Sequence, residues 1–263
     1  MTSKIAAQMF TLREHTKTAS DLAATLKKVS DIGYTAVQLS AVGCMNGDNP
    51  EVNVEMARKM LDDNGLKCIA THRGWTNFTE SIEAEIEFHK ILGCTFTAIG
   101  GIFKGYDNSI AGYRDFIKDA LPVIESLKSE GIQFGHHNHA KEFYKAQAHG
   151  QTLEDILIDE GGDDLKLELD LYWIEHAGAN CVQILDRCHG RVPVVHIKDK
   201  EVIPGENNTR IAPIGEGLFD WDYIIAAGER AGVEWYCVEQ DQCYRDEFDC
   251  MKSSYDFLSS KGL

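Results

Sequence analysis

The chain has 263 residues, of which 43% are hydrophobic, and its formal net charge is −16. A protein with this much negative charge repels phosphate backbones and anionic lipids. We therefore expect neither nucleic acid nor a membrane as a partner. The eight cysteines form no Cys-x-x-Cys pair, and no apolar run has the length of a bilayer span or a secretory leader. These features predict a reduced protein in the cytoplasm.

One pattern recurs along the chain: an amphipathic helix ends at a glycine, and β-forming residues follow at once. Helices are predicted over residues 18–32, 52–64, 81–92, 110–130, 221–231 and 248–260. Each of the first five is followed directly by a glycine: Gly33, Gly65, Gly93, Gly131 and Gly232. Glycine past a helix end adopts the left-handed conformation without steric cost, and the chain can then turn directly into a strand.

Eight strands fit this spacing. They are predicted over residues 5–10, 34–39, 66–70, 94–99, from 132 onward, 165–170, 192–197 and 233–238. Strands that alternate with helices pair in parallel, and eight such units in about 250 residues are typical of a single (β/α)₈ TIM barrel. An open doubly wound sheet is the main alternative, but no Gly-x-Gly-x-x-Gly follows the first strand. We therefore predict one α/β barrel domain over residues 1–263, with its active site at the C-terminal ends of the strands.

Ionisable residues gather at the ends of the last four strands. Glu142, Asp170, His196 and Glu239 come from four consecutive strand ends. Three carboxylates brought together in a cavity raise each other's pKa unless a cation lies between them. The sequence therefore predicts one divalent ion held by these four residues. Oxygen-rich ligands favour Mn²⁺, Mg²⁺ or Co²⁺, and Zn²⁺ stays an alternative.

Several stretches resemble the sugar phosphate isomerase/epimerase family of xylose isomerase-like TIM barrels, whose relatives include ketose 3-epimerases, inosose dehydratase and endonuclease IV. They are His-Asn-His-x-x-Glu-Phe (137–143), Glu-Leu-Asp-x-Tyr-Trp (168–173), His-Ile-Lys-Asp (196–199), Gly-Glu-Gly-x-x-Asp-Trp (215–221) and Val-Glu-Gln-Asp (238–241). The resemblance implies the same four metal ligands, with Lys198 and either His137 or His139 in the substrate pocket. In ketose epimerases the first ligand stands on strand five itself, so a histidine at 137 or 139 is an alternative to Glu142.

These residues permit proton abstraction beside a carbonyl. A divalent ion acidifies the carbon-bound proton, and a carboxylate removes it. By resemblance to the epimerases, Glu142 and Glu239 would face opposite sides of the substrate, and Lys198 could stabilise an oxyanion. Epimerisation, aldose–ketose isomerisation and dehydration all begin with this step. We therefore expect an isomerase, epimerase or dehydratase acting on a sugar, keto-sugar or inositol derivative; a DNA-repair enzyme and a non-catalytic sugar-binding barrel are the alternatives.

Further residues could contact the substrate. His72 and Arg73 end the third strand and could bind hydroxyls or a phosphate, although Arg73 could equally pair with surface acids. Trp173 could stack on a sugar face or pack locally. The long link over residues 199–221 is predicted to form a partial lid, from which Arg210 could reach an anionic group. A homodimer or homotetramer would be typical of such barrels.

Overall fold

Eight parallel strands close into a barrel in the computed structural model, which describes residues 3–102, 105–145 and 150–263. The strands of the barrel are β1 (Ile5–Gln8), β2 (Ala36–Leu39), β3 (Lys67–His72), β4 (Phe96–Ile99), β5 (Gln133–His137), β6 (Leu165–Asp170), β7 (Val194–Ile197) and β10 (Trp235–Val238). Pairing of β1 with β10 closes the ring. The predicted (β/α)₈ barrel is confirmed.

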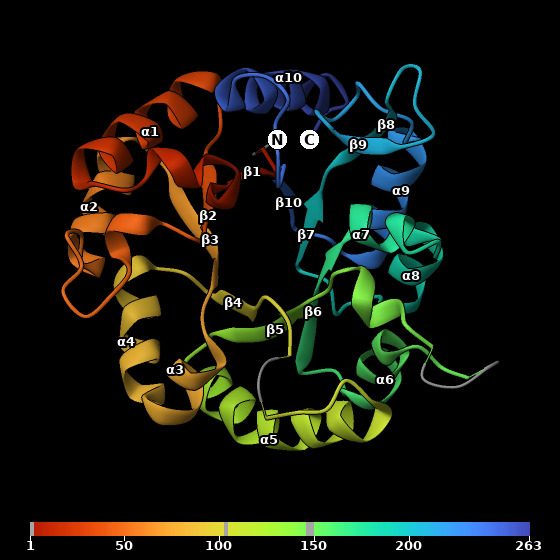
Figure 1. Cartoon of the computed structure of the whole chain (residues 1–263). Helices are drawn as coiled ribbons and strands as arrows, with labels where there is room; N and C mark the ends of the chain where they lie inside the picture. Colours follow the sequence, from red (N-terminus) through yellow and green to blue (C-terminus); the bar gives the residue numbers. More distant parts are fainter. Residues whose placement is uncertain (1–2, 103–104, 146–149) are drawn as a thin grey trace.

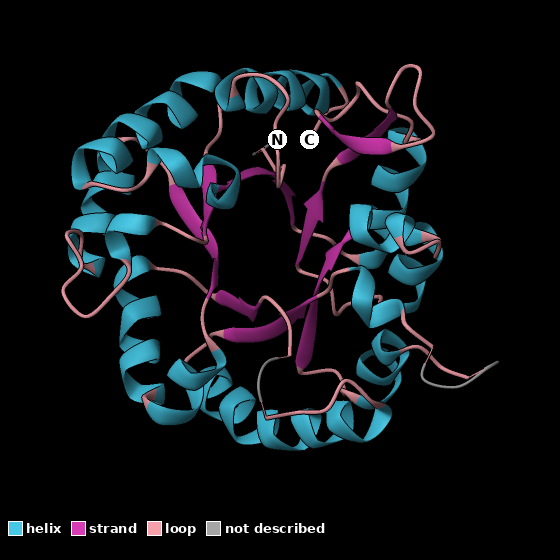
Figure 2. Ribbon diagram, in the orientation of Figure 1, coloured by secondary structure: helices cyan, strands magenta, loops and turns pink. Residues whose placement is uncertain are grey.

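Helices surround this ring of strands on all sides (Figures 1 and 2). They are α1 (Ala19–Ile32), α2 (Val54–Asp63), α3 (Trp75–Glu80), α4 (Ile82–Leu92), α5 (Ile110–Ser129), α6 (Leu153–Glu160), α7 (Leu171–His176), α8 (Cys181–Arg187), α9 (Trp221–Ala231) and α10 (Glu247–Ser260). Short 3₁₀ helices are η1 (Met9–His15), η2 (Gly43–Met45) and η3 (Ala140–Phe143). All five glycines predicted to terminate helices have positive φ. Within the described ranges, no helix combines the length and the apolarity that a membrane crossing requires.

The interior of the barrel has an apolar half, near the amino ends of the strands, and a polar half. Small buried side chains line the apolar half: Ala6, Ala36, Ala70, Ala98 and Cys237. Side chains two residues apart on a strand share a face, so the next inward position on each strand lies nearer its carboxyl end. On four of these strands that position holds a polar residue: Gln8, Gln38, His72 and Glu239. The alternation thus builds a polar layer directly on an apolar one.

Gly135 on β5 makes room for an aromatic ring inside the barrel. A Cβ added at Gly135 would lie 2.9 Å from the ring of Phe96 and 3.1 Å from the carbonyl oxygen of Lys166. The glycine is therefore required by close approach of its neighbours. Because His137 follows two residues later on the same face, the apolar filling ends immediately below that imidazole.

The link after β7 forms an antiparallel hairpin, β8 (Asp199–Val202) paired with β9 (Thr209–Ala212), which lies outside the ring of barrel strands (Figure 1). Asp199 anchors it: its carboxylate accepts hydrogen bonds from the backbone N–H of Gly215 at 2.9 Å and from the indole N–H of Trp221 at 2.7 Å. The predicted partial lid is therefore an ordered hairpin, tied by one buried carboxylate to the start of α9.

The helical layer of the protein contains a buried carboxyl group without a hydrogen-bond partner among the described residues. Glu154, on α6, is 1% exposed, and neither of its carboxyl oxygens has a hydrogen-bond partner among the described residues. Burial, and then the nearby charge of Glu142, raise the pKa of Glu154 to about 8. The group is therefore mainly protonated in the folded protein at neutral pH.

We predict that Glu154→Gln flattens the dependence of stability on pH. Between about pH 5 and 8 the unfolded chain loses the Glu154 proton while the folded protein keeps it. The free energy of unfolding of the wild type should therefore decrease with rising pH by on the order of 1.4 kcal/mol per pH unit more than that of the variant. Urea titrations at several pH values measure both slopes, and parallel slopes would contradict the assignment.

Candidate metal centre

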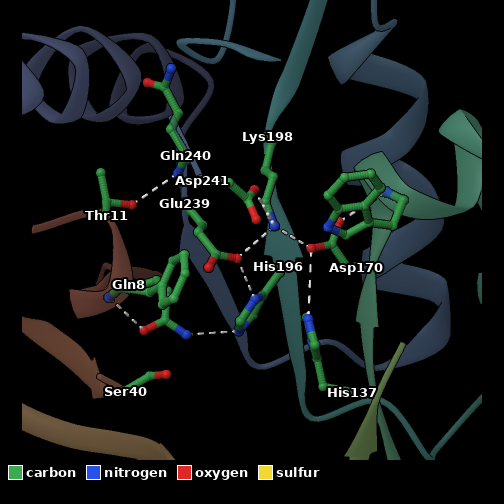
Figure 3. A network of polar contacts seen from close by, with 12 residues as sticks. Gln8, Thr11, Ser40, His137, Asp170, His196, Lys198, Glu239, Gln240 and Asp241 are labelled. Atoms are coloured by element: carbon green, nitrogen blue, oxygen red, sulfur yellow. Dashed lines mark hydrogen bonds and ion pairs between the residues drawn. The ribbon is translucent and has the colours of Figure 1, made fainter. Parts of the chain in front are cut away.

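Three of the four predicted ligands meet at the carboxyl ends of β6, β7 and β10. One ligand atom from each of Asp170, His196 and Glu239 lies within 4.8 Å of the others, and all three residues are buried (Figure 3). Asp170 and His196 are direct partners across β6 and β7, and Glu239 follows the last residue of β10. The barrel register therefore brings the three side chains together from distant parts of the sequence.

The ammonium of Lys198 lies between the two carboxylates of this group (Figure 3). It donates a short hydrogen bond to Asp170 and one of 2.6 Å to Glu239 Oε2, and lies 3.4 Å from Asp241 Oδ2. Burial disfavours the charged ammonium, but Asp170 and Glu239 outweigh this effect and hold the pKa of Lys198 above its usual value. Lys198 thus supplies a positive charge where the sequence predicted a cation.

The imidazole of His196 supplies a second positive charge. Its Nδ1 lies 2.7 Å from Glu239 Oε2. Burial lowers the pKa of the imidazole, but Glu168 and Glu239 overcome this and raise it to about 10. Burial also disfavours the charged form of Asp170, and it raises the pKa of this carboxyl group to about 6, although Lys198 opposes the rise. The buried negative charges are thus balanced by protonated side chains, and a divalent ion that binds at Nδ1 must displace a proton.

The residues present fit a divalent ion. Two carboxylates and one imidazole give an oxygen-rich donor set, with Asp170, Glu239 and Nδ1 of His196 as the atoms that could hold it. An ion at this position would share both carboxylates with Lys198. Cation binding and the position of the ammonium are therefore coupled by electrostatics.

Glu142, the fourth predicted ligand, lies apart from the other three. It belongs to η3, where its Oε2 accepts a hydrogen bond from the backbone N–H of His139 at 2.8 Å. Its Oε1 lies 3.7 Å from Nζ of Lys141. The 3₁₀ turn thus folds the carboxylate back onto its own backbone, away from the ligands and from the predicted position of a second base. On β5 it is His137 that reaches the cluster, with Nε2 at 3.9 Å from Asp170 Oδ2.

Of the cavities at this end of the barrel, two lie at or beside the candidate ligands. The smaller, of about 180 Å³, is lined by Phe10, Ser40, His72, Gly100, His137, His139, Lys198, Glu239 and Asp241. The larger, of about 570 Å³, is lined by Phe10, Arg13, Tyr172, Trp173, Thr209, Arg210, Ile211, Asp241, Gln242, Cys243 and Tyr244. They share Phe10 and Asp241, so the larger cavity adjoins the one that contains the candidate ligands.

Some of the residues predicted to contact substrate line these cavities, and others are paired elsewhere in the protein. His72, His137 and His139 line the smaller cavity, and Trp173 lines the larger. Arg73 instead forms a two-pronged ion pair with Glu85, at 2.8 and 2.5 Å, so its guanidinium is already engaged.

Arg210 lines the larger cavity, and its Nε donates to Glu201 of the facing hairpin strand at 2.6 Å. Of the two arginines predicted to contact substrate, only Arg210 therefore lies on the wall of one of these two cavities.

Glu168 on β6 is a central residue that the sequence reasoning missed. It is completely buried, and its Oε1 accepts a hydrogen bond from Nε2 of Gln38 at 2.8 Å. Three imidazoles surround its Oε2: those of His72, His137 and His196. The period-two alternation contained the signal, because Glu168 precedes Asp170 by two residues and must share its face.

Comparison with known proteins agrees with this architecture. The family model of the xylose isomerase-like TIM barrel matches residues 26–254. A sugar phosphate isomerase/epimerase from Parabacteroides distasonis superposes with a TM-score of 0.80 at 19% identity, covering 99% of this chain and 95% of that one. The IolI protein, solved with a bound zinc atom, superposes with a TM-score of 0.70 at 13% identity, covering 98% and 97%.

A curated relative is the probable endonuclease 4 of Mycobacterium tuberculosis, which is 27% identical over 162 residues. The match covers 59% of this chain and 62% of the relative, so the chain spans less than two thirds of the length of that protein. The family model, by contrast, covers all but the first and last segments of the chain. The chain belongs to the xylose isomerase-like TIM-barrel family.

Proposed function

We propose that this protein is a divalent-metal-dependent isomerase or epimerase that acts on a sugar or keto-sugar. The observation that carries the proposal is the convergence of Asp170, His196 and Glu239, with Lys198 between the carboxylates, at a cavity of about 180 Å³. The similarity to a sugar phosphate isomerase/epimerase and to a zinc-containing relative supports it.

Two charged side chains at the cavity have direct roles in this proposal. A bound divalent ion would polarise the carbonyl and acidify the adjacent carbon-bound proton. Glu239, which lies on the cavity wall, is the base that removes the proton. Lys198 donates a hydrogen bond to the substrate oxygen on which negative charge develops. The positive charge of Lys198, which is buried, is worth more there than it would be in water.

A second group must return the proton on the opposite face if the carbon centre is to invert. Because Glu142 is turned away, we propose His139 for this role. It lines the cavity, and burial, together with Lys198, lowers the pKa of its imidazole to about 4. Its Nδ1 has no hydrogen-bond partner in the described part of the chain. The unused nitrogen of this neutral imidazole can take up a proton from solvent and then return it to the opposite face of the carbon, while the abstracted proton stays on Glu239.

Elimination is the second candidate, because it begins with the same abstraction. The larger cavity of about 570 Å³ adjoins the small one and offers space for a leaving group. A dehydratase or lyase acting on a keto-inositol or 3-keto-sugar would use it in this way. A DNA substrate is less compatible with a chain of net charge −16, because phosphate backbones require clustered cations.

We expect the Mn²⁺-loaded protein to exchange one carbon-bound proton of a keto-sugar for deuterium in D₂O. Glu239→Gln should slow the exchange by about 100-fold or more, because the base is lost. Glu234→Gln, at the opposite end of the barrel, is the matched control and should exchange at the wild-type rate. NMR of a panel of keto-sugars and keto-inositols measures the exchange and identifies the carbon. Absence of exchange across the panel would contradict the proposal.

We expect Lys198→Met to destabilise the metal-free protein and to increase its stabilisation by metal. Loss of the ammonium leaves Asp170 and Glu239 buried with like charges, a change that typically costs about 3 kcal/mol. Mn²⁺ can replace the missing charge, so the rise in Tm on adding Mn²⁺ should be larger than in the wild type. Lys252→Met, at an exposed ion pair on α10, serves as the control. Equal rises in the two variants would show that Lys198 and the ion do not share ligands.

A further inference from the structure

We propose that the barrel contains a second divalent-cation site, formed by His72, His137 and Glu168 and adjoining the first. Ligand atoms of these residues and of His196 lie within 4.8 Å of one another. The side chains come from β3, β5, β6 and β7 and meet above the apolar filling of the barrel. We call this group the inner site, and Asp170, His196 and Glu239 the outer site.

The inner site is organised around one carboxylate oxygen. Oε2 of Glu168 has a short contact with Nε2 of His72 and lies 3.4 Å from Nδ1 of His137. Its partner Oε1 is held by the amide of Gln38, which fixes the rotation of the carboxylate. Nδ1 of His137 has no hydrogen-bond partner among the described residues, although the side chain is only 4% exposed. Such an orphaned nitrogen, directed at a carboxylate oxygen, is what a missing cation would leave.

The two sites can be filled together without sharing an imidazole. Nε2 of His196 lies 2.8 Å from the side-chain oxygen Oε1 of Gln38 and 3.2 Å from the side-chain nitrogen of Gln8. The shorter contact is with an acceptor, so Nε2 carries the hydrogen. Its Nδ1, beside Glu239, is then the atom that binds the ion of the outer site once its proton is displaced. The inner site keeps two imidazoles and one carboxylate of its own, and His72 and Glu168 belong to it alone.

The donor set of the inner site suits a different ion from that of the outer site. Two imidazoles and one carboxylate are typical ligands of Zn²⁺ or Co²⁺ with one position left open, whereas the outer site is richer in oxygen. Supporting contacts are in place: Gln38 holds Glu168, and Oγ of Ser40 lies 3.5 Å from Nδ1 of His72. His72 and His137 line the smaller cavity, which gives an ion a route from solvent.

A count of bound ions tests the inner site. The full chain, stripped with EDTA, is titrated with Co²⁺, and bound metal is measured by equilibrium dialysis and visible absorption. We expect two Co²⁺ per wild-type chain and one in His72→Asn, which retains the outer ligands. Glu239→Gln should lose the ion of the outer site and keep the ion of the inner site. The two variants should therefore have different Co²⁺ spectra. His189→Asn, an exposed histidine, is the control and should bind two.

Two results would overturn the inference. The first is a wild-type chain that binds one Co²⁺ at saturation, with this ion kept in His72→Asn and lost in Glu239→Gln, which means that Glu168 only accepts hydrogen bonds from protonated imidazoles. A His72→Asn variant that still binds two ions would also exclude the assignment. The wild-type count stands even if a variant fails to fold, which circular dichroism monitors. Since deuterium exchange reports on the outer site, loss of the inner site would leave the proposed function untouched.

Discussion

The polar half of the barrel depends on the balance of charge around three buried carboxylates. Glu168, Asp170 and Glu239 are at most 6% exposed, so each would be strongly destabilised without a positive partner. Lys198 and His196 provide such partners, and both have raised pKa values as a result. The same arrangement prepares the site for divalent ions, because it concentrates negative charge in a region that water reaches poorly. Folding and the proposed chemistry thus impose the same requirement on these side chains.

The barrel could be predicted because its signals are local. A glycine that ends a helix and a β-forming run that follows are neighbours in sequence, and five of the eight strands were found in this way. The other three were placed by the spacing of the elements. Boundaries were less accurate where side chains decide them. The first strand ends at Gln8 rather than Phe10, since the Gln8 side chain accepts a hydrogen bond from the N–H of Phe10 and begins a 3₁₀ helix. The hairpin after β7 was missed as a pair of strands, because Asp199 anchors it through partners 16 and 22 residues away.

The site residues that follow directly from strand ends were predicted, and those that depend on other features of the fold were not. Asp170, His196, Glu239 and Lys198 were predicted to meet because each stands at or next to a strand end, and the structure brings them together. Glu142 was assigned from its place after the fifth strand and from a motif, and neither gives an account of a 3₁₀ turn that returns the carboxylate to the backbone of His139. Glu168 was overlooked because only the last residue of its strand was considered, whereas inward-facing positions repeat every second residue. Alternation, applied to the whole strand, would have found it.

The hairpin β8–β9 forms part of the larger cavity through Thr209, Arg210 and Ile211, but it contributes no side chain to either group of candidate ligands. It is attached to the barrel through Asp199, outside the ring of strands. Substitutions along its exposed length would therefore reshape one wall of the binding region while the ion-holding residues keep their positions. For the proposed reaction, a change of substrate would thus require changes in one surface element, while the residues assigned to the ion and the proton stay in place.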